Sequence, residues 1–222
     1  MGSLFLVRHA TTDASATGRN LGRASDDPLT AEGVQLAGRT GTAIAAELAA
    51  LPHDEVRLLS SPAQRCRQTA AAIAGRLGLD EARIEIEPNL IEIDYGSWDG
   101  LTAEECRARD PELRAAWEAD PYTVRVPGGE SGADVERRAR PVLDAVETWL
   151  EADRARAAVV VSHNHVVRLR LARALGLPLA MYRRRVQADP GAYSLITFTP
   201  DGPIVRRVNA SPVPMAGQQL GR

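Results

Sequence analysis

The residues of this sequence best suited to chemistry come just after short apolar segments. The four apolar residues Leu4–Val7 predict a buried strand, and Arg8 and His9 follow it directly. A second apolar run, 158–161, is followed within two residues by His163. Because an open α/β sheet binds its ligand beyond the carboxyl ends of its strands, we expect these side chains to meet at one edge of the sheet.

Two more segments with reactive side chains follow predicted strands in the same way. Arg65 lies near the start of a helix expected after the strand 56–59, and Glu92 lies in a loop after the strand 84–87. Guanidinium groups match the oxygens of a phosphate, and free N–H groups at helix N-termini favour anions. A neutral imidazole can act as a nucleophile, and a carboxyl group can carry a proton. The combination predicts a site for a phosphoryl group.

Six short motifs resemble, in order, those of the histidine phosphatase (phosphoglycerate mutase-like) superfamily, over about residues 4–175. They are Leu6-Val7-Arg8-His9-Ala10, similar to the family's Arg-His-Gly signature; Asp27-x-Pro-Leu-Thr30 with Gly33 and Gln35; Ser61-Pro62 with Arg65 and Gln68-Thr69-Ala70; Leu90-x-Glu92 with Gly96 and Trp98-x-Gly100; Pro127-x-Gly-Glu-Ser131; and Val161-Ser162-His163. Each motif alone is common, and it is their succession that carries the resemblance.

The resemblance implies a phosphomonoester hydrolase that acts on a small phosphorylated metabolite through a phosphohistidine. It implies His9 as the nucleophile and Glu92 as the proton donor, which would begin protonated and later activate water. It implies that Arg8, Arg65 and His163 hold the phosphoryl oxygens, with electrostatic stabilisation as the main source of catalysis. No metal or cofactor is expected.

Two places depart from the family pattern. The family usually has an Asn a few residues after the nucleophile; by counting, Ser15 stands there, while Asn20 lies in a lengthened loop, and either could bind phosphate. The common Gly-Gly after His163 is replaced by Asn164-His165. The backbone N–H of Asn164 could still reach the phosphate, but we expect both side chains to crowd the mouth of the site.

Strands alternate with helices along the chain, which predicts an α/β fold: a three-layer α/β/α sandwich with a mostly parallel central sheet and a small helical insertion near residues 100–130. Residues 1–212 are expected to form a single domain and 213–222 a flexible tail. Ser61 is expected to cap a helix that starts at Pro62, and 11–28 to form a long loop. The predicted helices are 31–50, 62–77, 102–109, 111–118, 132–153 and 166–175, and the predicted strands are 4–7, 56–59, 84–87, 158–161, 193–199 and 204–208.

The composition excludes several classes of function. A net charge of −2 gives no reason to expect nucleic acid or an anionic membrane as partner. All 27 basic residues are arginine, which excludes a P-loop lysine and a Schiff-base lysine. The two cysteines are too few for a disulfide framework, and no apolar stretch approaches the length of a signal-peptide core or a transmembrane helix. A cytoplasmic protein is therefore expected.

Several alternatives stay open. A phosphoglycerate mutase would carry Glu-Arg-His-Tyr-Gly, whereas residues 92–96 read Glu-Ile-Asp-Tyr-Gly, which favours hydrolysis. Ala10 and the departures just described would also fit a phosphate-ester binder that has lost activity. His163 and His165 could bind a metal with Glu92, although the neighbouring arginines would oppose a cation. The run 183–185 of three arginines is either a solvated face or a surface that steers an anionic substrate, and the edge at 84–87 could support a homodimer.

Overall fold

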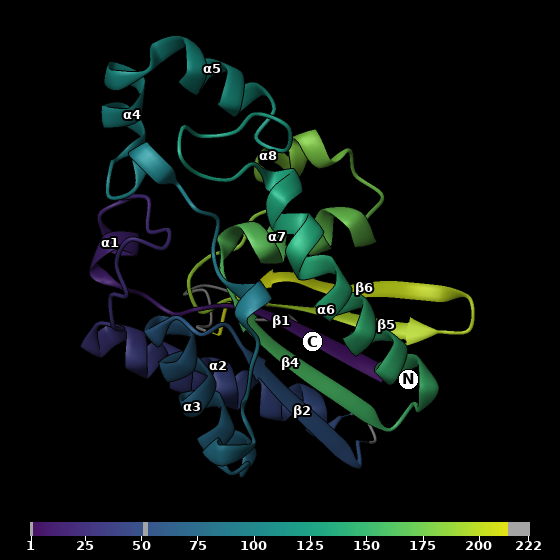
Figure 1. Ribbon diagram of the computed structural model, residues 1–222. Coiled ribbons are helices and arrows are strands. Elements are labelled where there is room, and N and C mark those ends of the chain that lie inside the picture. Colours follow the sequence, from purple (N-terminus) through teal and green to yellow (C-terminus); the bar gives the residue numbers. More distant parts are fainter. Residues whose placement is uncertain (1, 51–52, 213–222) are drawn as a thin grey trace, which may run out of the picture.

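A six-stranded mixed sheet forms the centre of the protein in the computed structural model, which describes residues 2–50 and 53–212 (Figure 1). The strand order is β3-β2-β4-β1-β5-β6. The first four strands in this order run parallel to one another, whereas β5 is antiparallel to both of its neighbours, β1 and β6. The tail predicted for 213–222 lies outside the described residues. The strands are β1 (Gly2–Arg8), β2 (Glu55–Ser60), β3 (Glu85–Ile86), β4 (Arg156–Ser162), β5 (Tyr193–Thr199) and β6 (Gly202–Ala210).

Helices cover both faces of the sheet, which confirms the predicted three-layer architecture (Figure 1). Because successive side chains of a strand point to opposite faces, β1 serves both layers. Leu4 and Leu6 pack in one core cluster with α6 (Gly132–Ala152) and α7 (Asn164–Ala174). Phe5 and Val7 pack in the other, with α2 (Ala31–Ala49) and α3 (Gln64–Leu77). The central strand is thus buried from both sides, as its unbroken apolar run indicates.

The predicted insertion is present as two short helices beyond the carboxyl edge of the sheet (Figure 1). The Thr102 hydroxyl and the Glu105 carboxylate form the expected capping box at the start of the first of them. Trp98 and Trp117 meet edge to face under the insertion and anchor it. The remaining helices are α1 (Asp13–Ala16), α4 (Ala103–Arg109), α5 (Pro111–Ala119) and α8 (Tyr182–Arg185), with 3₁₀ turns η1 (Glu81–Arg83), η2 (Pro88–Leu90), η3 (Gly96–Trp98) and η4 (Leu179–Met181).

Three local predictions were wrong in detail. The helix expected from Pro62 starts at Gln64 with Ala63 as its N-cap; the Ser61 hydroxyl lies 2.7 Å from His163 Nε2 and accepts a longer hydrogen bond, at 3.4 Å, from the N–H of Ala63. The expected loop 11–28 contains one helical turn, α1, which is too short to show periodicity in the sequence. The edge strand β3 pairs over two residues only, and Ile86 on it is 48% exposed. Among residues 2–50 and 53–212, no helix has the length and apolar character needed to cross a membrane.

Candidate active site

The register of the sheet brings three predicted site segments to one edge. β2, β4 and β1 are neighbours in that order and run parallel, and Val161 of β4 is level with Ser60 on one side and Val7 on the other. The residues that follow these strands therefore emerge side by side. Backbone bonds fix this arrangement: the N–H of Ser61 donates to Val161 at 3.0 Å and that of His9 to Ser162 at 2.9 Å.

His9 is held as a neutral imidazole with one ring nitrogen available. Its Nδ1 lies 2.8 Å from the carbonyl oxygen of Ala10, and since a carbonyl can only accept, Nδ1 carries the proton. The lone pair is then on Nε2. Burial, followed by the positive charges of Arg8 and Arg65, lowers the pKa of His9 to about 3. The ring is therefore uncharged throughout the physiological pH range, as a nucleophile must be.

His163 lies beside it, with the two ring centroids 5.3 Å apart in an edge-to-face arrangement. The Nε2 of His163 is 2.7 Å from the hydroxyl of Ser61, and the ring is fully buried. Burial and the charge of Arg65 hold the pKa of His163 well below its usual range. This ring is also neutral, and Ser61 fixes its orientation.

Arg8 and Arg65 bring two guanidinium groups to the same place. Each donates to a backbone carbonyl: Arg8 Nη1 to Ala188 at 2.8 Å and Arg65 Nη2 to Gly22 at 3.1 Å. Within the described part of the chain neither forms an ion pair, and the Nε of each is buried without a hydrogen-bond partner. Arg65 is only 1% exposed. A buried charge without a counter-ion is costly, so these donors are suited to a bound anion.

Glu92 supplies a buried carboxylate at the same site. Its Oε1 accepts from the backbone N–H of Ile93 at 2.9 Å and of His165 at 3.3 Å, and lies 3.3 Å from His165 Nδ1. Burial acts to raise the pKa of this carboxyl. The contact with His165 and the N–H of Ile93 outweigh burial and hold the pKa well below its usual range. Glu92 is therefore ionised in the substrate-free structure, and the expectation that it starts the reaction protonated requires it to take up a proton when substrate binds.

His165 does not crowd the mouth of the site as predicted. The side chain is fully buried and packs between aromatic rings, with centroids 5.4 Å from Tyr95 and 5.7 Å from Tyr182. Adjacent positions of a helix point about 100° apart, so Asn164 at the start of α7 faces the cavity while His165 faces the core. The His165 ring therefore lies in the core, with its Nδ1 3.3 Å from Glu92 Oε1.

The other three residues predicted to bind phosphate, Ser15, Asn20 and Asn164, all line the same cavity. The Ser15 hydroxyl is engaged in the capping box of α1, donating to the Thr12 carbonyl at 2.9 Å. The Asn20 amide donates to the Trp98 carbonyl at 3.2 Å, which ties the loop to the insertion. The Oδ1 of Asn164 is buried without a partner among the described residues. Of the three, only Asn164 has a buried polar atom left unsatisfied.

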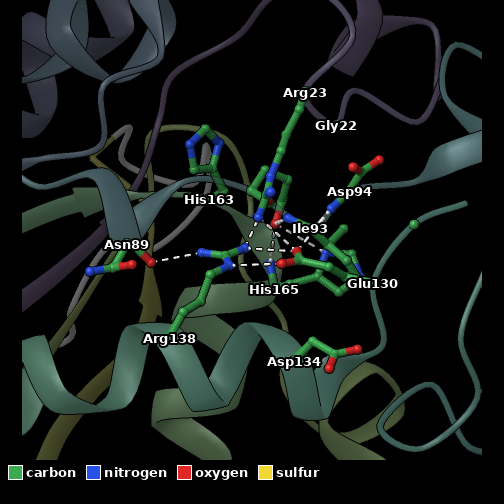
Figure 2. Close-up of polar contacts among 12 residues, drawn as sticks. Gly22, Arg23, Asn89, Ile93, Asp94, Glu130, Asp134, Arg138, His163 and His165 are labelled. Carbon is green, nitrogen blue, oxygen red and sulfur yellow. Dashed lines mark hydrogen bonds and ion pairs between the residues drawn. The ribbon is translucent and has the colours of Figure 1, made fainter.

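A network behind the acid was not recognised from the sequence (Figure 2). Arg23 Nε and Arg138 Nη2 both donate to the backbone carbonyl of Glu92, each at 3.0 Å. The carboxylate of Glu130 pairs with both arginines, at 2.8 and 3.1 Å, and accepts from the N–H of Asp94 at 3.1 Å. Glu130 lies in the motif Pro127-x-Gly-Glu-Ser131. Its contact with Arg23, which is distant in the sequence, could not be predicted from that motif.

Arg8, His9 and Glu92 line a cavity of about 580 Å³, including the part open to solvent, whereas Arg65 and His163 are buried and are not part of its lining. Arg183 of α8 lies in its wall, 175 positions along the chain from Arg8. Tyr95 also lines the cavity, whereas Trp98 is buried beneath the insertion. Within the described ranges no three His, Cys, Asp or Glu side chains gather where they could hold a metal ion. The chemistry on offer is a neutral nucleophile, a carboxylate and an excess of positive charge.

Comparison with known proteins agrees with this arrangement. The sequence model of the histidine phosphatase superfamily, branch 1, matches residues 4–211. A bifunctional protein of Mycobacterium tuberculosis is 34% identical over 207 residues, which are 93% of this chain and 53% of that protein. The chain thus spans about half the length of that relative.

Two further relatives are matched over nearly their whole length. Phosphoserine phosphatase 1 of Hydrogenobacter thermophilus is 31% identical over 211 residues, with 94% of this chain and 92% of that protein covered. A solved structure of a mycobacterial glucosyl-3-phosphoglycerate phosphatase in complex with VO3 superposes with a TM-score of 0.78 at 27% identity, covering 94% of this chain and 99% of that one. Both the sequence and the fold are therefore similar to those of phosphatases.

Proposed function

Because the chain belongs to branch 1 of the histidine phosphatase superfamily, we propose that it hydrolyses phosphate monoesters of small metabolites through a phosphohistidine on His9. The observation that carries this proposal is the pairing of a neutral His9 with Arg8 and Arg65, which have no acidic partners in the described chain. A phosphoryl group would supply the missing negative charge and present phosphorus to Nε2.

The first step transfers the phosphoryl group to the enzyme. His9 Nε2 forms a bond to phosphorus while the ester P–O bond breaks, and the guanidiniums of Arg8 and Arg65 with His163 and the N–H of Asn164 hold the remaining oxygens. The leaving oxygen takes a proton from Glu92. That carboxyl is ionised without substrate, and a phosphate dianion beside it raises its pKa by like-charge repulsion, so that it takes up the proton on substrate binding.

The second step releases phosphate. Glu92, now a carboxylate again, accepts a proton from water as the water oxygen attacks phosphorus and the P–N bond to His9 breaks. Two backbone N–H groups donate to Oε1 of Glu92 and fix the carboxylate, so the same group can serve both steps. Glu92 therefore serves both proton transfers, first to the leaving oxygen and then from water.

Two variants and a control test the assignment on p-nitrophenyl phosphate. His9→Ala is expected to abolish turnover, and Glu92→Gln to slow it by about 10²–10⁴-fold while inhibition by inorganic phosphate changes little, because only the proton transfer is removed. His53→Ala alters a histidine far from the site and should leave the rate unchanged. Near-normal activity of His9→Ala would show the proposal to be wrong.

Two other outcomes would redirect the assignment. Interconversion of 3- and 2-phosphoglycerate after priming with bisphosphoglycerate would indicate a mutase. Failure to form an acid-labile phosphoenzyme from any phosphodonor would indicate a phosphate-ester binder without activity. The absence of the Arg-His pair of the mutases from residues 92–96 favours hydrolysis.

We also propose a cytoplasmic location and a homodimer. Both cysteines are free and buried, as suits a reducing compartment. The edge strand β3 exposes Ile86 and has unpaired backbone groups that a second copy could extend. Light scattering of the purified chain and of Ile86→Lys tests the dimer, which the substitution should dissociate.

A further inference from the structure

Arg183 gives the cavity a cationic group beyond those that a phosphoryl group needs. It comes from α8 and lines the cavity together with Arg8 and His9. Its guanidinium carbon lies 4.3 Å from the ring centroid of Trp117, which fixes the side chain by a cation–π contact. The position is therefore ordered and not that of a mobile surface arginine.

The positive charge at this end of the cavity is not neutralised. In the described part of the chain Arg183 forms no ion pair, and its Nη1 is buried without a hydrogen-bond partner. Arg168 donates from Nη1 to the Arg183 carbonyl at 3.4 Å, and its own Nε is also unpartnered. Burial, then the charges of Arg183 and Arg8, lower the pKa of Arg168 to about 10, which leaves Arg168 protonated at neutral pH.

The nearby acids have other partners. Asp189 faces Arg8 and Arg168, but its carboxylate accepts from Gln187 at 3.0 Å and from Asn209 at 2.8 Å. The Glu92 carboxylate accepts from the backbone N–H groups of Ile93 and His165. The arginines at this end thus form no ion pair within the described residues, and Asp189 offsets the charges of Arg8 and Arg168 only without direct contact.

Two other arginines of this region differ from Arg183 because each pairs with a carboxylate. Arg114 stacks on the same Trp117 ring at 4.8 Å, yet its Nε pairs with Glu118 at 2.8 Å. Arg19 lines the same cavity, yet its Nη1 pairs with Glu105 at 3.0 Å. Arg183 shares the stacking of the first and the location of the second but has neither carboxylate.

We propose that the substrate is a phosphomonoester carrying a second anionic group, a carboxylate or a second phosphate, which Arg183 binds while the reacting phosphate lies on Arg8 and Arg65. This inference rests on the proposed phosphatase activity and names its substrate class. The second anion accepts from the guanidinium of Arg183, which lines the cavity and is held in place by the Trp117 ring.

Matched substrate pairs test this. 3-Phosphoglycerate differs from glycerol 3-phosphate by a carboxylate in place of a hydroxymethyl group, and fructose 1,6-bisphosphate differs from fructose 6-phosphate by a second phosphate. We expect the wild-type kcat/KM to favour the member with the second anionic group in at least one pair by about ten- to a hundredfold, the value of a charge-assisted hydrogen bond. The pair that shows the preference identifies the anion.

Arg183→Gln should reduce this preference to less than about threefold. For the member of the pair that lacks the second anionic group, kcat/KM should stay within about threefold of wild type. Arg185→Gln is the matched control: it removes the same charge from an exposed arginine of α8 that does not line the cavity, and it should keep the preference. Arg183→Lys keeps the charge without the planar fork and should retain part of the preference, which separates loss of charge from loss of packing.

The outcomes are distinct. A preference that persists in Arg183→Gln, or an equal loss on both members of a pair, would overturn the inference, as would a wild-type enzyme that shows no preference. If the wild-type protein hydrolyses neither these esters nor p-nitrophenyl phosphate, the proposed activity fails instead. Thermal denaturation of each variant confirms that it is folded.

Discussion

Removal of the charge on Glu130 tests whether the network behind Glu92 positions the acid (Figure 2). Glu130→Gln keeps the shape of the side chain but leaves Arg23 and Arg138 without their counter-ion. Both arginines donate to the Glu92 carbonyl, so their displacement moves the carboxyl group that must reach the substrate. The residue itself does not line the cavity, so an effect on catalysis can only be indirect.

The size of the stability loss follows from burial. Breaking a fully buried pair costs about 3–5 kcal/mol, and an exposed pair is worth about 0–1 kcal/mol. The side chains of Glu130 and Arg138 are 17% and 16% exposed, and that of Arg23 is 31% exposed, which places the network between these limits. We expect Glu130→Gln to lower the free energy of unfolding by about 2 kcal/mol and, for a chain of this length, to lower Tm by about 4–8 °C.

The pH dependence has a defined sign. Burial acts to raise the pKa of Glu130, but the hydrogen bonds and charge of Arg138 lower it below its ordinary value of 4.5. A carboxyl whose pKa is lowered by folding stabilises the protein above its unfolded pKa and loses that contribution as the pH falls through the folded value. The difference between wild type and Glu130→Gln should therefore be full at pH 7 and should shrink below about pH 4.

Urea denaturation and steady-state kinetics measure the two effects. A displacement of about 1 Å can cost about 10²-fold in rate, so kcat should fall by about ten- to a hundredfold while inhibition by inorganic phosphate stays within about threefold. Glu85→Gln is the control, because it breaks a more exposed ion pair, that of Glu85 on β3 with Arg57 at 2.5 Å. It should leave kcat unchanged and should change the free energy of unfolding by no more than about 1 kcal/mol. An unchanged kcat in a destabilised Glu130→Gln would refute the positioning role.

Two further predictions concern the buried histidines. Ser61→Ala removes the 2.7 Å partner of His163 and should lower kcat/KM by about tenfold and the free energy of unfolding by about 1–3 kcal/mol, the cost of an unsatisfied buried polar group; wild-type values for both would contradict it. Burial lowers the pKa values of His9, His163 and His165, so each binds a proton more tightly in the unfolded chain, whose histidines titrate near pH 6.5. The free energy of unfolding should therefore fall as the pH is lowered from about 7 to 4, with His9 contributing down to about pH 3, and a free energy that stays constant over that range would show that these side chains are not buried as neutral rings.

The sequence by itself determined the layers and the principal site segments. The uninterrupted apolar runs of β1 and β4 predict strands buried on both faces, and polar residues directly after them must emerge at the carboxyl edge of a parallel sheet. Arg8, His9 and His163 are fixed by this local logic alone. Helix starts with a capping box, such as Thr102 with Glu105, could be placed correctly because the interaction lies within four residues.

Tertiary structure decided what depends on partners distant in the sequence. The Ser61 hydroxyl forms its shorter hydrogen bond with His163, 102 positions away, and a longer one, at 3.4 Å, with the N–H of Ala63 before its own helix. His165 turns to Glu92 because the first turn of α7 directs it into the core. Arg183 reads as one of three adjacent arginines, and only the fold shows that it lies on Trp117 in the cavity wall without a counter-ion. Periodicity and capping report contacts a few residues apart, whereas the charge state and orientation of a buried side chain depend on all its neighbours in space.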